Sequence, residues 1–224
     1  EKRNIFMVKS FIEVENLSKN FDEKKVLDNL SFIVERGEIV KISGDNGSGK
    51  STLLKIIARI YTQDSGQIKI EDKKISNSSL SKSKISYASS DFIFYKDLTV
   101  KKNLLLFFNL IGEDKNVYEK NKTFLDIEKF ENLYPDTLSN GQKKKMNLFR
   151  CLIPKYPIYL LDEPENGLDD KSKMDLDNRL IELSKSSTII YTSHNFGLLS
   201  FYDKTSKEIK LWKISIKFFL LSKL

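Results

Sequence analysis

The chain has 224 residues, of which 40% are apolar and 31% are charged, a composition typical of a globular protein with one sizeable core. No apolar stretch reaches the roughly 18 residues needed to cross a membrane, and the opening apolar run at 5–8 is too short for a secretory signal. The net charge of +7 suits an anionic membrane surface or nucleic acid, although a solvated lysine-rich surface explains it equally well.

The first part of the chain is predicted to form β-strands. It begins at Glu1 instead of Met, which indicates an incomplete start, with Met7 as a candidate natural one. Apolar and polar residues alternate around 12–15, 30–35 and 68–71, the pattern of half-buried antiparallel strands. The more continuous apolar run at 39–42 is typical of a buried strand.

A glycine-rich motif, Gly-Asp-Asn-Gly-Ser-Gly-Lys-Ser-Thr, follows this buried strand at 44–52 and precedes a run at 53–60 with apolar residues at helical spacing. A strand, a glycine loop and a helix in this order form a phosphate-binding P-loop, and the match makes an accidental glycine-rich turn a weak alternative. Glycines allow backbone N–H groups to turn around an anion, and the helix directs its positive end at the same place. We expect Lys50 to reach the β- and γ-phosphates and the Ser51 hydroxyl to ligate Mg²⁺. The predicted nucleotide-binding residues are Gly44, Asp45, Asn46, Gly47, Ser48, Gly49, Lys50, Ser51 and Thr52.

The middle of the chain is predicted to be a helical subdomain inserted into an α/β core. A polar, serine-rich stretch at about 80–90 indicates a connection. Apolar residues between Val100 and Ile111 then recur at helical spacing, and a lysine- and asparagine-rich stretch follows. We expect the helical subdomain over about 90–150, within a single domain whose α/β core and N-terminal antiparallel β subdomain comprise about 1–89 and 151–224.

The segment Leu-Ser-Asn-Gly-Gln at 138–142 precedes a predicted helix, with Ser139 or Asn140 as its N-cap. By itself it is a polar loop before a helix and indicates no chemistry.

The only cysteine, Cys151, excludes an intrachain disulfide and favours a reducing compartment. It lies in an apolar run, so we expect a buried structural thiol.

Two adjacent carboxylates end a second predicted buried strand at 158–161. A carboxylate is costly to bury without a cation or hydrogen-bond donors, so Asp162 is a candidate to hold Mg²⁺. Glu163 is a candidate to orient and polarise the water that attacks the γ-phosphorus. The alternative is an exposed acidic turn before Pro164.

The rest of the chain continues the alternation of helices and strands. Residues 170–183 are predicted to form a helix and 188–192 a third core strand, so the pattern favours a mainly parallel sheet with right-handed crossovers. Near the end, Trp212 begins an alternation of apolar and lysine or serine residues that extends to Phe218. We expect a strand on the core there, with a basic aromatic edge lying on a membrane as the alternative.

With the P-loop, the 138–142 segment and Leu-Leu-Asp-Glu-Pro at 160–164 in this order, the chain resembles an ATP-binding-cassette (ABC) ATPase from about Ile12 to His194. The segment at 138–142 is the discriminating motif, since the other two occur across many P-loop proteins. The resemblance implies a P-loop NTPase core and two cassettes that pack head to tail around two ATP molecules.

The resemblance also implies roles for single residues. Ser139 and Gly141 would contact the γ-phosphate of ATP held by the partner's P-loop. Phe21 would stack on adenine, although a core phenylalanine is an equal alternative. Residues 166–169 resemble the D-loop, which communicates between the two sites. His194, the only histidine, stands where the family has its switch histidine and would hydrogen-bond the γ-phosphate and orient Glu163 or the attacking water.

Two positions depart from the family pattern. Ser90 stands where the Q-loop glutamine, which helps to ligate Mg²⁺, is expected. Serine is shorter, so we expect a water or Asp91 to substitute, with weakened catalysis or altered coupling. Asn140 replaces a signature glycine, and asparagine tolerates unusual backbone angles better than most residues.

The resemblance implies the ATP-binding and ATP-hydrolysing subunit of a transporter, peripheral on the cytoplasmic side of a membrane. It would work with a separate transmembrane permease subunit and as a homodimer or heterodimer of cassettes. Closure on ATP and reopening after hydrolysis would drive transport. The short chain and the region 87–98 resemble export-type ATPases, including those of haem export and cytochrome maturation and of polysaccharide or drug exporters, so we expect export.

Two other functions compete with this one. A soluble ABC ATPase acting on nucleic acid or complex assembly is permitted by the net charge. However, the stretch between Thr52 and Leu138 has no heptads for an inserted coiled coil, and translation-factor types usually carry two cassettes, so nucleic acid is not expected. A regulatory subunit with little hydrolysis is supported only by Ser90 and Asn140, and the intact Glu163 argues against it.

Overall fold

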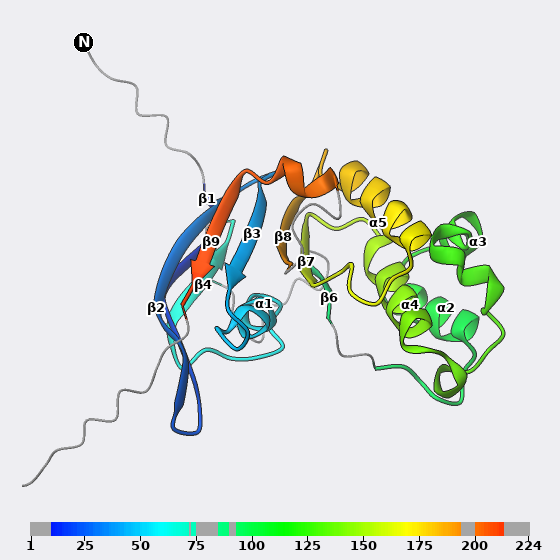
Figure 1. Ribbon diagram of the computed structural model, residues 1–224, viewed down its shortest axis with the longest axis horizontal. Coiled ribbons are helices and arrows are strands. Elements are labelled where there is room, and N and C mark those ends of the chain that lie inside the picture. Colours follow the sequence, from blue (N-terminus) through cyan, green and yellow to red (C-terminus); the bar gives the residue numbers. More distant parts are fainter. Residues whose placement is uncertain (1–9, 72, 75–84, 90–92, 194–199, 213–224) are drawn as a thin grey trace, which may run out of the picture.

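The computed structural model describes residues 10–71, 73–74, 85–89, 93–193 and 200–212. Two β-sheets with one helix between them form one part of the molecule, and most of the remaining helices gather at the other end (Figure 1). This confirms the predicted α/β fold with a parallel sheet and a separate antiparallel β subdomain. The boundaries proposed near 90 and 150 stay a prediction.

The antiparallel sheet contains β1 (Ser10–Phe21), β2 (Lys24–Glu35), β4 (Ser65–Ile70) and the short β5 (Lys73–Lys74), in the order β2-β1-β4-β5. Ile12 of β1 lies opposite Val34 of β2 and Ile70 of β4, and all three are buried. Because alternate side chains of a strand share one face, the alternation in the sequence predicts this buried face correctly.

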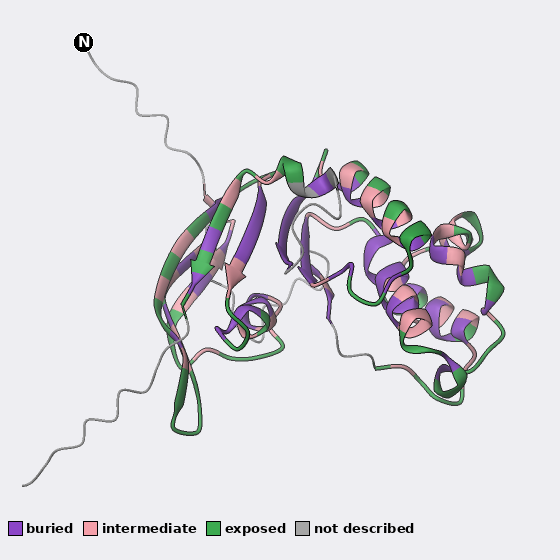
Figure 2. Cartoon of the chain, in the orientation of Figure 1, coloured by how far each residue is buried: buried purple, intermediate pink, exposed green. Residues whose placement is uncertain are grey.

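The second sheet is parallel and has the order β6-β7-β8-β3-β9. Every residue of the neighbouring strands β7 (Ile158–Asp162) and β8 (Thr188–Thr192) is buried (Figure 2). Buried parallel strands need nearly continuous apolar runs, and the prediction of both strands from such runs is confirmed.

Two strands of this sheet differ from the sequence analysis. β6 (Ile85–Ala88) lies in what was predicted to be a polar connection. Its polar Ser86 is buried because the hydroxyl donates a hydrogen bond to the Cys151 carbonyl oxygen, 2.7 Å away. The last described strand, β9 (Lys207–Leu211), pairs with β3 (Ile39–Gly44) and precedes the predicted C-terminal alternation, which beyond Trp212 lies outside the described residues.

Helix α1 (Lys50–Ile57) packs between the two sheets. Four of its apolar residues are fully buried in one cluster with residues of β1, β2, β4, β3 and β9: Leu53, Leu54, Ile56 and Ile57. Burial on both sides fixes the start of α1 relative to the end of β3, so the loop between them has defined end points.

The helical end of the molecule contains α2 (Val100–Leu110), α3 (Asn116–Asn121), the 3₁₀ segments η1 (Phe124–Lys129) and η2 (Pro135–Thr137), and α4 (Asn140–Leu152). Phe149 of α4 packs against Phe108, Tyr118 and Phe124. The opposite face of α4 packs with α5 (Asp170–Leu183) and the parallel sheet, so α4 joins the two parts.

Cys151 of α4 is buried, as predicted. A final 3₁₀ segment, η3 (Ser200–Lys204), leads into β9. Among the described helices, none has the length and apolar character to cross a membrane.

Helix α4 begins with a reciprocal cap, which decides between the two predicted N-caps in favour of Ser139. The Gln142 N–H donates to Ser139 Oγ at 3.2 Å, and the Ser139 N–H donates to Gln142 Oε1 at 2.9 Å. This capping box satisfies two N–H groups that otherwise lack helical partners.

We expect Ser139→Ala to lower the free energy of unfolding by about 1 kcal/mol, because it removes the side-chain acceptor of the cap. Urea denaturation without nucleotide measures this change. Thr99→Ala, which removes the N-cap of α2, is the matched control on another helix and should have a similar cost. An unchanged unfolding midpoint for Ser139→Ala alone would show that the cap is not formed in solution.

Candidate functional site

The glycine loop between β3 and α1 has a backbone that side chains cannot follow. Gly49 has φ +97°, and a Cβ there would lie 2.8 Å from Leu27 Cδ2 and 3.0 Å from the Val26 carbonyl oxygen. At Gly44, a Cβ would lie 2.3 Å from the Leu211 carbonyl oxygen. These positions need glycine, so the loop can turn tightly into α1.

Lys50 begins α1 and is buried inside this loop. Its Nζ donates hydrogen bonds to the carbonyl oxygens of Gly44, at 2.8 Å, and Asp45, at 3.0 Å. The ammonium group therefore lies against the start of the loop, next to the N-terminus of α1. A cation and a helix N-terminus in the same place form a strong binding site for an anion.

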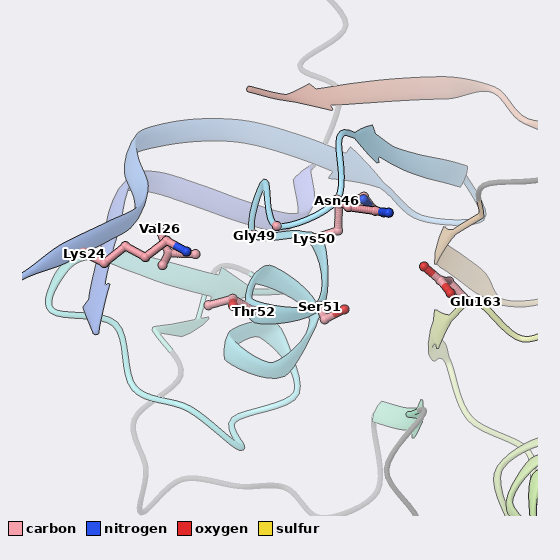
Figure 3. Close-up of a pocket in the computed structure, with 9 residues that line it drawn as sticks. Lys24, Val26, Asn46, Gly49, Lys50, Ser51, Thr52 and Glu163 are labelled. Carbon is pink, nitrogen blue, oxygen red and sulfur yellow. The ribbon is translucent and has the colours of Figure 1, made fainter. Parts of the chain in front are cut away.

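A pocket of about 300 Å³ opens over the loop and the start of α1. Glu163, from the end of β7, lines this pocket and faces the loop from the opposite side (Figure 3). The pocket therefore brings together residues far apart in the sequence, with a cation on one side and a carboxylate on the other. Its lining residues are Lys24, Val26, Asn46, Gly47, Gly49, Lys50, Ser51, Thr52 and Glu163.

Hydrogen bonds at the ends of β7 and β8 hold the two predicted carboxylate residues. The buried Asp162 accepts a hydrogen bond at Oδ1 from the Thr192 hydroxyl at 2.8 Å, and the same hydroxyl oxygen accepts from the Glu163 N–H at 3.0 Å. The Glu163 carboxylate accepts a hydrogen bond from the Asn166 side-chain amide. Sequence reasoning missed Thr192 and this contact of Asn166. A polar residue at the carboxyl end of a buried strand, next to the end of β7, is the one signal that could have identified Thr192.

The oxygen donors near the pocket are of the chemical kind that Mg²⁺ takes. Ser51 lines the pocket, and the buried Asp162 precedes Glu163 at the end of β7. Within the described ranges, no three His, Cys, Asp or Glu side chains converge on one point. Mg²⁺ is usually bound by one or two carboxylates together with waters and substrate phosphates, so one carboxylate and one hydroxyl are donors of the kind it takes.

The predicted signature residues Ser139 and Gly141 do not line this chain's own pocket but lie beside the predicted D-loop. An ideal Cβ on Gly141 would be 3.2 Å from the Gly167 carbonyl oxygen. Lys145 Nζ lies 2.7 Å from Asp169 Oδ2. Hydrogen bonds from Lys145 and Ser172 hold the pKa of Asp169 below its ordinary value. The two predicted segments therefore form one surface.

Burial has a different effect on Lys144, the neighbour of Lys145 on α4. Loss of hydration lowers the pKa of its ammonium group, and the nearby carboxylates of Glu165, Asp162 and Glu163 oppose that change. The triple lysine of the sequence is therefore not a uniform solvated surface.

Four other predicted residues lie apart from the pocket or outside the described ranges. Phe21 ends β1, is 40% exposed and packs edge-on against Tyr61, with ring centroids 5.6 Å apart. It is not among the residues that line the pocket. Ser90, Asp91 and His194 lie outside the described residues, so their predicted roles stay predictions.

Comparison with known proteins identifies close similarity to one family. A family model described as ABC transporter matches residues 27–166. The probable sulfate/thiosulfate import ATP-binding protein CysA of Chlorella vulgaris is 31% identical over 192 residues, which cover 83% of this chain and 81% of that protein. The Fe(3+) ions import ATP-binding protein FbpC of Escherichia coli O157:H7 is 28% identical over 84% of this chain. The chain spans 56% of the length of FbpC.

Solved structures agree with this similarity. A dimeric bacterial ABC transporter cassette superimposes with a TM-score of 0.80 at 26% identity, covering 90% of this chain and 94% of the other. A dimeric cassette in a post-hydrolysis state, bound to ADP and Pi, superimposes with a TM-score of 0.77 at 25% identity, covering 89% and 94%.

Proposed function

Because this chain belongs to the ABC transporter family, as an ATP-binding cassette of the ABC ATPase type, we propose that it hydrolyses ATP to energise transport through a separate membrane-spanning partner. The single observation that carries the hydrolytic role is the shared pocket of Lys50 and Glu163. The P-loop would bind the phosphates, and Glu163 would orient and polarise the attacking water. Lys50 would stabilise the charge that develops on the transferred phosphoryl group.

Mg²⁺ would be held by Ser51 and Asp162, with Ser90 or Asp91 as a further ligand. When bound, the metal would neutralise charge on the phosphate oxygens. The role of the chain is to supply fixed oxygen donors next to the loop, because the hydrogen bond from Thr192 restrains the Asp162 side chain.

Removal of Mg²⁺ tests the hydrolytic role directly. We expect the purified chain to release phosphate from ATP with Mg²⁺ present, and we expect excess EDTA to reduce this rate to background, because charge neutralisation is lost. Restoring Mg²⁺ should restore the rate. Phosphate release that continues unchanged in EDTA would contradict the assigned site.

A cassette dimer would complete the site. Ser139 and Gly141 lie on a different surface from this chain's own pocket, which supports a role at the pocket of a second cassette. The start of α4 would add a second set of backbone donors to the γ-phosphate. Phe21 would stack on adenine, and His194 would contact the γ-phosphate; both roles rest on their positions in the sequence.

The surface beside α2 supports docking of a membrane-spanning partner. Ile93, Tyr95 and Leu110 are 84%, 63% and 69% exposed and line a common hollow. The backbone of Tyr95 is fixed, since its N–H donates a hydrogen bond to the Asn103 side-chain oxygen and its carbonyl oxygen accepts one from the Asn103 side-chain NH₂. A patch of exposed apolar side chains is typical of an interaction site. This docking would place the chain at the cytoplasmic face of a membrane.

The direction of transport, export or import, does not follow from membership of the family. The predicted export role stays a prediction, and the names of the relatives, which are import proteins, give it no support. Homodimer and heterodimer both fit the proposed site.

A further inference from the structure

The backbone of Glu163 has an unusual conformation for a residue with a side chain. Its φ is +47°, in the left-handed region that glycine adopts readily and other residues adopt at a cost. Hydrogen bonds restrain it on both sides. Its N–H donates to Thr192 Oγ1 at 3.0 Å, and its carbonyl oxygen accepts from Lys144 Nζ at 2.8 Å. Strained backbone persists where its surroundings fix it, and here it carries the candidate catalytic carboxylate.

A buried lysine such as Lys144 is an unusual hydrogen-bond donor to a main-chain carbonyl oxygen. It is 5% exposed, and its Nζ also lies 3.5 Å from the Asp162 carbonyl oxygen. Successive helix residues point about 100° apart, so only one residue of the run 143–145 can face β7. Lys145 instead reaches Asp169. Burying an ammonium group is costly unless hydrogen bonds and nearby charges compensate, so its presence against the end of β7 calls for a role.

We propose that Lys144 is a positioning residue that holds the main chain of Glu163 so that the carboxylate faces the nucleotide pocket. Lys144 lies on α4, the helix that begins within the 138–142 segment. A shift of α4 when that segment contacts a nucleotide is therefore passed directly to the main chain of Glu163. The link joins the two functional surfaces of one chain and rests on the proposed ATPase function.

The kinetic test compares three variants of the full chain. Lys144→Met keeps much of the volume but cannot donate a hydrogen bond, whereas Lys144→Gln keeps a donor. Lys143→Met removes the same charge one residue earlier and is the matched control. We expect Lys144→Met to lower kcat about tenfold with KM for ATP nearly unchanged, because misalignment affects the reacting state more than binding. Lys144→Gln should recover part of the loss, and Lys143→Met should resemble the wild type.

A spectroscopic test is independent of turnover. The bond between Glu163 and Pro164 is the only Glu–Pro bond in the sequence. Labelling with ¹³C-glutamate and ¹⁵N-proline therefore gives a single carbonyl–nitrogen cross-peak that reports the Glu163 carbonyl. We expect Lys144→Met to move this peak strongly, Lys144→Gln to move it less, and Lys143→Met to leave it in place.

The outcomes separate the two proposals. An unmoved cross-peak in Lys144→Met, or a kcat equal to the wild type, would overturn the positioning role. Equal losses in Lys144→Met and Lys144→Gln, without partial recovery, would also overturn it, because the hydrogen bond would then not be the cause. A wild-type chain that does not hydrolyse ATP, with a cross-peak that still moves, would overturn the ATPase function and retain the contact.

Discussion

Glu163→Gln should bind ATP, form an ATP-dependent dimer and hydrolyse ATP about 10²–10³-fold more slowly than the wild type. The substitution keeps the size of the side chain but removes the carboxylate that lines the pocket opposite Lys50. Without it, the attacking water would lose its proposed hydrogen-bond acceptor, whereas the P-loop would still contact the phosphates. ATP then persists between the two cassettes, and the closed state accumulates.

Light scattering with and without Mg-ATP measures the dimer, and phosphate release measures hydrolysis. Glu128→Gln, at an exposed position of the helical end, is the control and should hydrolyse ATP at the wild-type rate. A persistent monomer that still binds ATP would indicate a heteromeric site or an obligatory membrane partner. Loss of ATP binding altogether would contradict the P-loop interpretation.

The parts of the fold that follow local patterns were predictable from the sequence. The bounds of α5 and β8 agree with the prediction, because helical and strand periodicities are local properties. The strand β6 was missed because the residues around it are polar. Ser86 is tolerated inside the sheet only because α4 supplies the Cys151 carbonyl as an acceptor. That partner lies far along the chain, and no local pattern reveals it.

The candidate site likewise contains residues that local motifs predict and residues that only tertiary packing brings together. Lys50 and Glu163 belong to motifs whose spacing encodes their surroundings, so the sequence predicts them. Thr192 and Lys144 act through the main-chain N–H and carbonyl oxygen of Glu163, which tertiary packing brings to them. The lysine run 143–145 looks like a solvated helix face, and only the packing of α4 against the sheet shows that Lys144 is buried. Contacts of this kind need the structure.

Lys50→Ala should reduce kcat/KM for ATP by about 10³-fold or more, the largest change expected for a single substitution in this chain. Two losses add here. The variant lacks the cation that would face the β- and γ-phosphates, and it also lacks the two hydrogen bonds to the Gly44 and Asp45 carbonyl oxygens that hold the start of the loop. Lys173→Ala, which removes a lysine of α5 far along the sequence from the loop, is the control and should keep wild-type kinetics.

Binding and folding can be measured together for Lys50→Ala. A ligand that binds only the folded state stabilises it by about 2.7 kcal/mol when its concentration is 100 times Kd. We therefore expect ATP to raise the urea midpoint of the wild type and of Lys173→Ala but not that of Lys50→Ala. Without ATP, the midpoint of Lys50→Ala should change little, because the desolvation of a buried ammonium group offsets the two hydrogen bonds it makes. An ATP-dependent rise in the Lys50→Ala midpoint equal to that of the wild type would show that ATP binds elsewhere, and the assignment of the loop would then be wrong.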